Sequence, residues 1–186
     1  MPIITERPLV DRSPYRVGAD RLSAVIVPAL VAGIVAIIIN IIVLDTLAAA
    51  GIATGGGALQ KLVRSWLSAP LVAAGVNHGW TLLGLPGPDT DLFKTGFKVL
   101  VGLLMALVYT LLLAPRLRGG SLRKGLIAAL LFWLVNAFVV LPLLGDGIAG
   151  VATLTPTGIV SFALAHSLFF VVLAYMFTAL RQRRPS

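Results

Sequence analysis

The fold is decided by a hydrophobic stretch at residues 22–44, LSAVIVPALVAGIVAIIINIIVL, which contains no charged side chain. A helix needs roughly 20 apolar residues to cross the hydrocarbon core of a bilayer, so this stretch can span it once. It is also longer than the apolar region of a cleaved secretory signal, which has about 7–15 residues. We therefore expect it to be an uncleaved signal-anchor span.

Three further stretches have the same length and character, at residues 95–114, 125–144 and 158–180. The chain has 186 residues, of which 58% are hydrophobic and only 12% charged. An ordinary soluble domain has about 25% charged residues. Residues 1–186 are therefore predicted to form a single all-α integral membrane domain, a four-helix bundle of transmembrane helices.

The distribution of Lys and Arg predicts how the chain is oriented. Eleven of the 15 lie in the N-terminal segment at residues 1–21, in the short connection at residues 115–124 and in the tail after residue 180. The positive-inside rule then places both termini in the cytoplasm, the 45–94 connection in the periplasm, and the chain in a bacterial inner membrane. Because topology and anionic lipid at the cytoplasmic face account for the net charge of +8, no nucleic-acid partner is expected.

The long 45–94 connection is predicted to contain an amphipathic helix at residues 58–69, ended by Pro70. A tryptophan on its apolar face and cations on its polar face indicate a helix that lies in the membrane interface. Residues 71–88 are apolar but broken by Gly and Pro, so we expect a re-entrant or surface-packed segment, with a helical hairpin as the alternative. The apolar stripe, expected to face lipid or a partner, consists of Leu59, Leu62, Val63, Trp66 and Leu67.

Three polar residues are predicted to lie inside the bilayer: Asn40, Asn136 and His166. Buried polar groups in membrane helices commonly hydrogen-bond across helices. Since Asn136 and His166 have similar depths on neighbouring antiparallel spans, we expect a neutral His166 beside Asn136 in a structural role. The alternatives are an axial ligand to a haem or to chlorin magnesium, and a transport path lined by all three residues.

Sequence motifs for enzymatic chemistry are absent, as are cysteines and mid-span carboxylates. We therefore expect a non-catalytic accessory subunit of a larger bacterial membrane complex, respiratory or photosynthetic, without a cofactor of its own apart from the His166 alternative. Its partners would be bound lipid and other membrane subunits. These subunits would hold the proline-containing N-terminal segment and the RQRRPS tail. A small homo-oligomeric transporter or channel is the alternative function.

A sparse pattern of Gly, Pro, Lys, aromatic and His residues extends over the last three predicted spans, about half of the chain. In this pattern the chain resembles small four-helix bacterial membrane proteins of the YagU-like type. The resemblance implies a helical bundle and supplies no activity. The residues that carry it are Gly102, Tyr109, Pro115, Gly119, Gly120, Lys124, Gly125, Trp133, Pro142, Gly145, Ala165 and His166.

Overall fold

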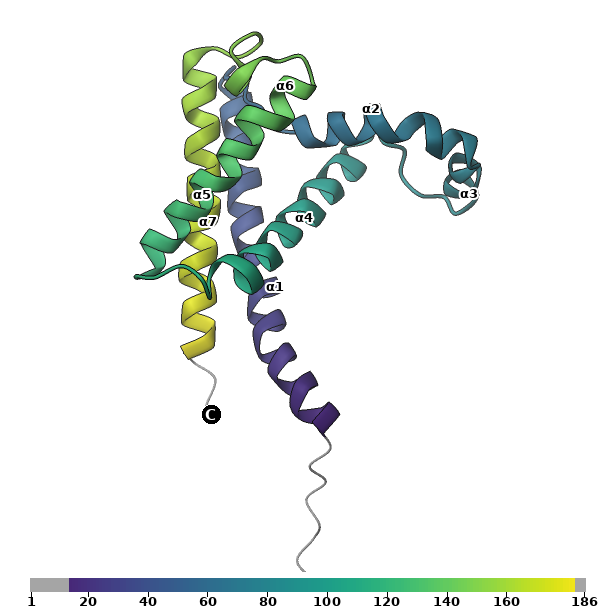
Figure 1. Cartoon of the computed structure of the whole chain (residues 1–186). Helices are drawn as coiled ribbons and strands as arrows, with labels where there is room; N and C mark the ends of the chain where they lie inside the picture. Colours follow the sequence, from purple (N-terminus) through teal and green to yellow (C-terminus); the bar gives the residue numbers. More distant parts are fainter. Residues whose placement is uncertain (1–13, 183–186) are drawn as a thin grey trace, which may run out of the picture.

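The computed structural model describes residues 14–182, which form helices and loops without any strand (Figure 1). Residues 1–13 and 183–186, the two chain ends that are expected to be held by partners, lie outside the described residues. Four helices are long and apolar enough to cross a membrane, so the chain is an all-α multi-pass membrane protein, as predicted. These spans are Ser23–Ala49, Asp91–Leu113, Ser121–Leu143 and Pro156–Gln182.

The helices extend beyond the predicted hydrophobic stretches because helix ends are determined by capping rather than by hydropathy. The second span begins at Asp91, where the Thr90 side chain accepts a hydrogen bond from the Phe93 amide at 3.3 Å. The first helix likewise continues past Leu44 to Ala49. The long helices are α1 (Pro14–Ala49), α4 (Asp91–Val108), α5 (Ser121–Val135) and α7 (Pro156–Gln182).

Two π-helical turns lie inside the second and third spans, each shortly before a proline. They are η1 (Tyr109–Leu113), which precedes Pro115, and η2 (Asn136–Val140), which is followed by the short helix α6 (Leu141–Leu143) containing Pro142. A proline ring clashes with the carbonyl four residues earlier and has no N–H to donate. The wider turn accommodates the ring while the neighbouring amides stay bonded, as in the 2.7 Å hydrogen bond from the Ala114 amide to the Tyr109 carbonyl.

Small residues allow the helices to pack closely. A Cβ added to Gly125 of α5 would lie 2.8 Å from the Phe170 carbonyl oxygen of α7, and one added to Gly33 of α1 would lie 2.8 Å from the Ala106 Cβ of α4. The buried core between these helices contains Tyr109 and Phe170. Helices α1, α5 and α7 form a contiguous group, whereas α4 packs mainly against α1. The predicted four-helix bundle is therefore open on one side.

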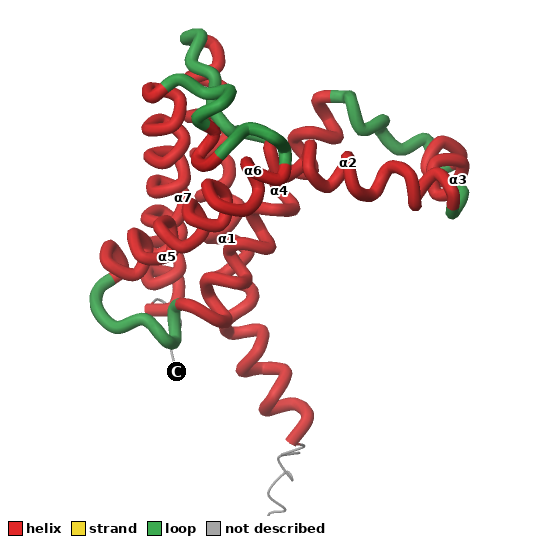
Figure 2. The backbone as a smooth tube through the Cα atoms, turned by 45° about the horizontal axis from the view of Figure 1, so that its top comes forward, coloured by secondary structure: helices red, strands yellow, loops and turns green. Residues whose placement is uncertain are grey.

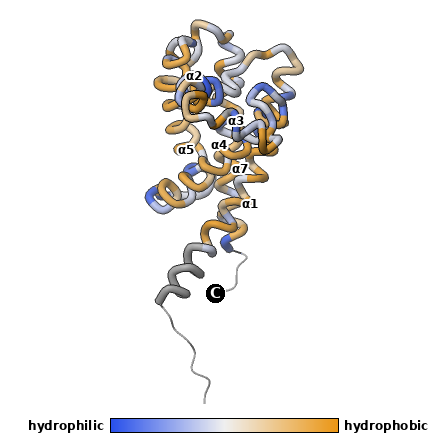
Figure 3. Tube along the Cα trace, turned by 90° about the vertical axis from the view of Figure 1, so that its right-hand side faces the viewer, coloured by the Kyte–Doolittle hydropathy of each residue, from blue (hydrophilic) through white to orange (hydrophobic). Residues whose placement is uncertain are grey.

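The two ends of the bundle are more hydrophilic than the helix surface between them, as the hydropathy colouring of Figure 3 shows. The terminal end carries the start of α1, the α4–α5 connection and the end of α7 (Figure 1). The far end carries the remaining two connections, including the 3₁₀ turn η3 (Ile148–Gly150). Hydrophilic residues gather at both ends, with apolar helix surface between them.

At the far end, α2 (Ala58–Ala73) and α3 (Val76–Leu82) project sideways from the bundle (Figures 1 and 2). The prediction that the helix ends before Pro70 is wrong. Pro70 lies near the end of α2 and removes only one backbone hydrogen bond, while its carbonyl still accepts from the Ala74 amide at 2.9 Å.

The segment at residues 71–88 forms the end of α2, α3 and a loop, and it extends beyond the bundle instead of packing on it. It returns to the first turn of α4 through Trp80, whose ring lies edge-on to Phe93 at a centroid distance of 6.0 Å. The indole Nε1 also donates to the Pro86 carbonyl at 2.9 Å. We call α2, α3 and this loop the arm.

Candidate intramembrane pocket

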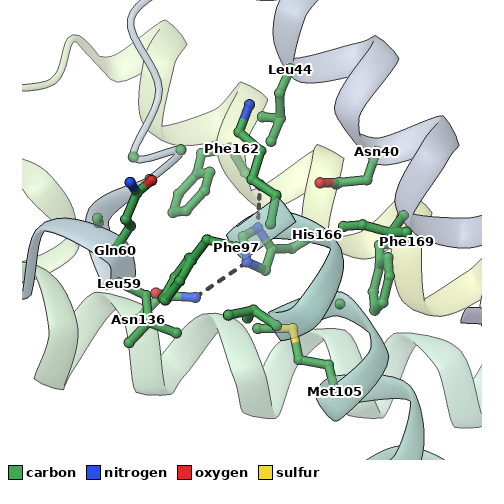
Figure 4. A pocket seen from close by; sticks show the side chains of 18 residues that line it. Asn40, Leu44, Leu59, Gln60, Phe97, Met105, Asn136, Phe162, His166 and Phe169 are labelled. Carbon is green, nitrogen blue, oxygen red and sulfur yellow. Dashed lines mark hydrogen bonds between the residues drawn. The ribbon is translucent and has the colours of Figure 1, made fainter. Parts of the chain in front are cut away.

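The three polar residues predicted inside the bilayer line one pocket (Figure 4). Asn40 comes from α1, Asn136 from the first position of η2 and His166 from the middle of α7. The pocket has a volume of about 100 Å³, and most of its wall is apolar. Helix packing thus brings together residues that lie far apart in the chain. Asn40 and His166, for example, are 126 positions apart. The apolar wall includes Phe97, Met105, Phe162 and Phe169.

Both ring nitrogens of His166 have a partner. Nδ1 lies 3.2 Å from the Phe162 carbonyl oxygen, which can only accept, so Nδ1 carries the hydrogen. Nε2 lies 3.2 Å from Nδ2 of Asn136 and therefore accepts from the amide. This arrangement is that of a neutral imidazole, and it includes the expected contact between Asn136 and His166.

Asn40 joins α1 to α7 in a different way. Its Nδ2 donates to the backbone carbonyl of Ala165 at 2.9 Å, and the side chain is buried. It therefore approaches His166 through the neighbouring residue's backbone and not through a side-chain contact. Among the described residues, no fully buried side-chain nitrogen or oxygen lacks a hydrogen-bond partner.

The apolar stripe of α2 is divided between two environments. Leu62 is buried against Val140 and Leu141, and Leu59 lines the pocket. Trp66 and Leu67 are exposed, and Val63 is half-buried. The prediction that the whole stripe faces lipid or a partner is therefore wrong at Leu62, which the chain's own η2 and α6 cover.

A polar vestibule of about 600 Å³ adjoins the pocket and shares Gln60 and Lys98 with it. Three ion pairs border it. The structure pairs Lys98 with Asp45 at 3.4 Å, Lys94 with Asp91 at 3.1 Å, and Arg64 with Asp89 through two hydrogen bonds.

The Arg64–Asp89 pair fastens α2 to the loop before α4. The hydrogen bond from Arg64 lowers the pKa of the Asp89 carboxyl below its usual range, and the same bond raises the pKa of Arg64. Both side chains are largely exposed, so solvent screens this attraction and it contributes little to global stability.

The pocket ends inside the bundle. Its wall includes Ile37, Met105 and Phe169. Beyond them towards the terminal end lies the close-packed core, with Ala36, Ala106 and Phe170 fully buried. The described residues that line the pocket lie between the middle of the spans and the far end, and none of them lies at the terminal end.

A haem or chlorin bound axially at His166 would have to displace a hydrogen bond of the imidazole and enlarge the pocket. Both ring nitrogens are already hydrogen-bonded, and a cavity of about 100 Å³ is smaller than the roughly 300–1,000 Å³ of typical ligand pockets. Within the described part of the chain, no group of three or more His, Cys, Asp or Glu is placed to hold a metal ion.

Comparison with models of protein families, with curated proteins and with solved structures gave no significant match. The resemblance to the YagU-like type therefore stays a prediction.

Proposed function

We propose that the chain is a non-catalytic accessory subunit of a larger membrane complex, in a bacterial inner membrane with both termini cytoplasmic. The charges at its two ends support this orientation. Lys124 and Arg181 lie at the terminal end with Arg116, Arg118 and Arg123. The Asp residues whose side chains the structure describes all lie at the far end. Such asymmetry is typical of a cytoplasmic face at the cationic end.

The observation that carries the subunit proposal is the open position of α4. In the span that contains α4, only 22% of the most apolar stretch is buried inside the protein, compared with 39% in the span formed by α1. From its contact with α1, α4 diverges towards the far end and meets the arm there (Figure 1). Large apolar side chains are exposed along both elements, among them Leu100 and Leu104 of α4 and Trp66 and Val72 of α2. A second subunit packed on this side would close the bundle and cover the arm.

Photo-crosslinking in native membranes tests this proposal, because a cysteine-free chain allows single labelling sites. Leu104→Cys and Val72→Cys place a photoreactive maleimide on α4 and on the arm. Leu164→Cys is the matched control on α7, where the native side chain is similarly exposed. We expect both test positions, and not the control, to crosslink one distinct polypeptide that co-purifies in constant stoichiometry in mild detergent. A chain that purifies alone and crosslinks only to lipid would contradict the proposal.

A homo-oligomeric transporter or channel is the second candidate, favoured by one observation. Asn40, Asn136 and His166 line a single pocket, and polar residues at membrane depth often mark solute paths. A path across the bilayer would then require a second copy of the chain. In the same experiment, this function predicts crosslinks between copies and a stable homo-oligomer. That the complex is respiratory or photosynthetic stays a prediction.

A further inference from the structure

A second hollow lies at the terminal end, on the other side of the buried core from the intramembrane pocket. It is bounded by the start of η1, the chain after η1, the beginning of α5 and the last turns of α7, and its volume is about 470 Å³. It shares no lining residue with the intramembrane pocket. The residues that matter for its chemistry are Tyr109, Lys124 and Arg181.

The hollow has two cations and no carboxylate in its lining. Within the described part of the chain, neither Lys124 nor Arg181 forms an ion pair. One N–H of Lys124 donates to the Ala114 carbonyl at 3.0 Å, which leaves two donors on its ammonium group. The Arg181 guanidinium lies over the Phe177 ring, 5.7 Å from its centroid, an arrangement that leaves hydrogen-bond donors at its edge. Two cations that line one hollow repel each other, and an anion bound between them would offset that repulsion.

Tyr109 supplies a third, neutral donor. Only 1% of this residue is exposed. Its hydroxyl makes no hydrogen bond with any described residue, so its oxygen is not one of the fully buried polar atoms, all of which have a partner. The other buried polar side chains, Asn40, Thr110 and Asn136, each have a partner. Because Tyr109 lines the hollow, its hydroxyl can donate to a bound ligand. Position also matters, since Tyr109 begins a π-helical turn, a feature that is frequent at functional sites.

We propose that this hollow binds a phosphate group, held by Lys124 and Arg181 and by a hydrogen bond from the Tyr109 hydroxyl. Cationic side chains and directed donors are the usual partners of phosphate oxygens. The apolar wall formed by Ala114, Pro115 and Phe177, at the end of three spans, favours the head group of an anionic phospholipid over a soluble phosphate. The inference does not depend on the subunit role, and it uses the proposed orientation only to assign the lipid to the cytoplasmic leaflet.

Native mass spectrometry of the whole chain, released from nanodiscs of equal parts phosphatidylglycerol and phosphatidylcholine, tests the site. We expect the wild type to retain one phosphatidylglycerol selectively. The double variant Lys124→Gln, Arg181→Gln should retain at least tenfold less, and Tyr109→Phe, which keeps the ring, about fivefold less. The matched control is Arg118→Gln, Arg123→Gln, which removes the same charge from the same end outside the hollow.

Two results would overturn the proposal. One is unchanged retention in the Lys124, Arg181 double variant with its helical content intact. The other is an equal loss in the Arg118, Arg123 control, which would show a diffuse charge effect. Glycerol phosphate, added at the same concentration as the lipid, distinguishes the sources. Failure to displace the lipid supports the phospholipid, whereas displacement would overturn that assignment in favour of a soluble phosphate. Neither result depends on whether a partner subunit exists.

Discussion

At the scale of single residues, the depth of a polar group was predictable, but not all of its partners. Asn136 and His166 lie on neighbouring antiparallel spans, so their similar depths were enough to predict the contact. Asn40 has a suitable depth too, but its amide bonds the Ala165 backbone. Which group it reaches depends on the rotation of α1 about its axis, and the sequence of a nearly uniform apolar helix does not specify that rotation.

His166→Gln tests the structural role of the histidine. Glutamine keeps a polar group that can hydrogen-bond, so we expect a loss of at most about 1–2 kcal/mol in stability and an unchanged visible absorption spectrum. His78→Gln, which alters the histidine of α3, is the control. Loss of a haem or chlorin band in His166→Gln alone, in the purified protein or its parent complex, would instead show that His166 is an axial ligand.

A pH titration tests the Arg64–Asp89 pair that fastens the arm. Because Arg64 lowers the pKa of Asp89, the pair should be complete above the ordinary Asp pKa of about 3.9 and be lost as the pH falls through the lowered value. Spin labels at Ser68→Cys and Gly87→Cys report the separation of α2 from the loop. We expect a narrow distance distribution at neutral pH that broadens only in strong acid, and in Asp89→Asn at neutral pH. A broad distribution for the wild type at pH 7 would contradict the pairing.

At the scale of elements, helical periodicity predicted α2 and its polar face but not what covers its apolar face. Leu62 and Trp66 belong to the same stripe, one turn apart, yet only Leu62 is covered by η2 and α6. That cover comes from residues about 80 positions later in the chain. Pro70 does not end α2, because a proline close to the end of a helix removes only one backbone hydrogen bond.

Leu62→Asp and Leu67→Asp form a matched pair that separates the two environments. At position 62 an aspartate would be buried without a partner and the leucine packing would be lost, so we expect thermal stability in detergent to fall by roughly 3 kcal/mol. At the exposed position 67 the loss should be below about 1 kcal/mol. Equal losses at both positions would show that Leu62 is not covered by the chain itself.

A second matched pair tests the close approach of α5 to α7. An alanine at position 125 would bring its Cβ within 2.8 Å of the Phe170 carbonyl oxygen, whereas one at position 96 meets nothing within 4 Å. Gly125→Ala should therefore destabilise the protein by about 1–3 kcal/mol through overpacking. Gly96→Ala should be neutral or stabilising, because alanine favours helix. A stable Gly125→Ala variant would mean that the helices lie farther apart than described.

At the scale of the whole molecule, four spans and their antiparallel order could be predicted from length, hydropathy and charge. The divergence of α4 could not, because every span has an apolar surface and hydropathy does not distinguish lipid from a neighbouring helix. For the same reason, the sequence indicated the polar residues of the intramembrane pocket but not the pocket. The proposed phosphate site could not be predicted from the sequence either. Tyr109 appeared there only in the sparse pattern of the resemblance, and Lys124 and Arg181 only among the cations that indicate orientation.

The orientation of the chain is part of the proposed function and underlies the leaflet assignment, and one labelling experiment tests it directly. Thr153→Cys places a thiol on an exposed residue at the far end, and Arg118→Cys places one at the terminal end. In intact spheroplasts, a membrane-impermeant maleimide should label Cys at position 153 at once and Cys at position 118 only after the membrane is permeabilised. Labelling of position 118 alone in intact spheroplasts would show the reverse orientation and contradict the account.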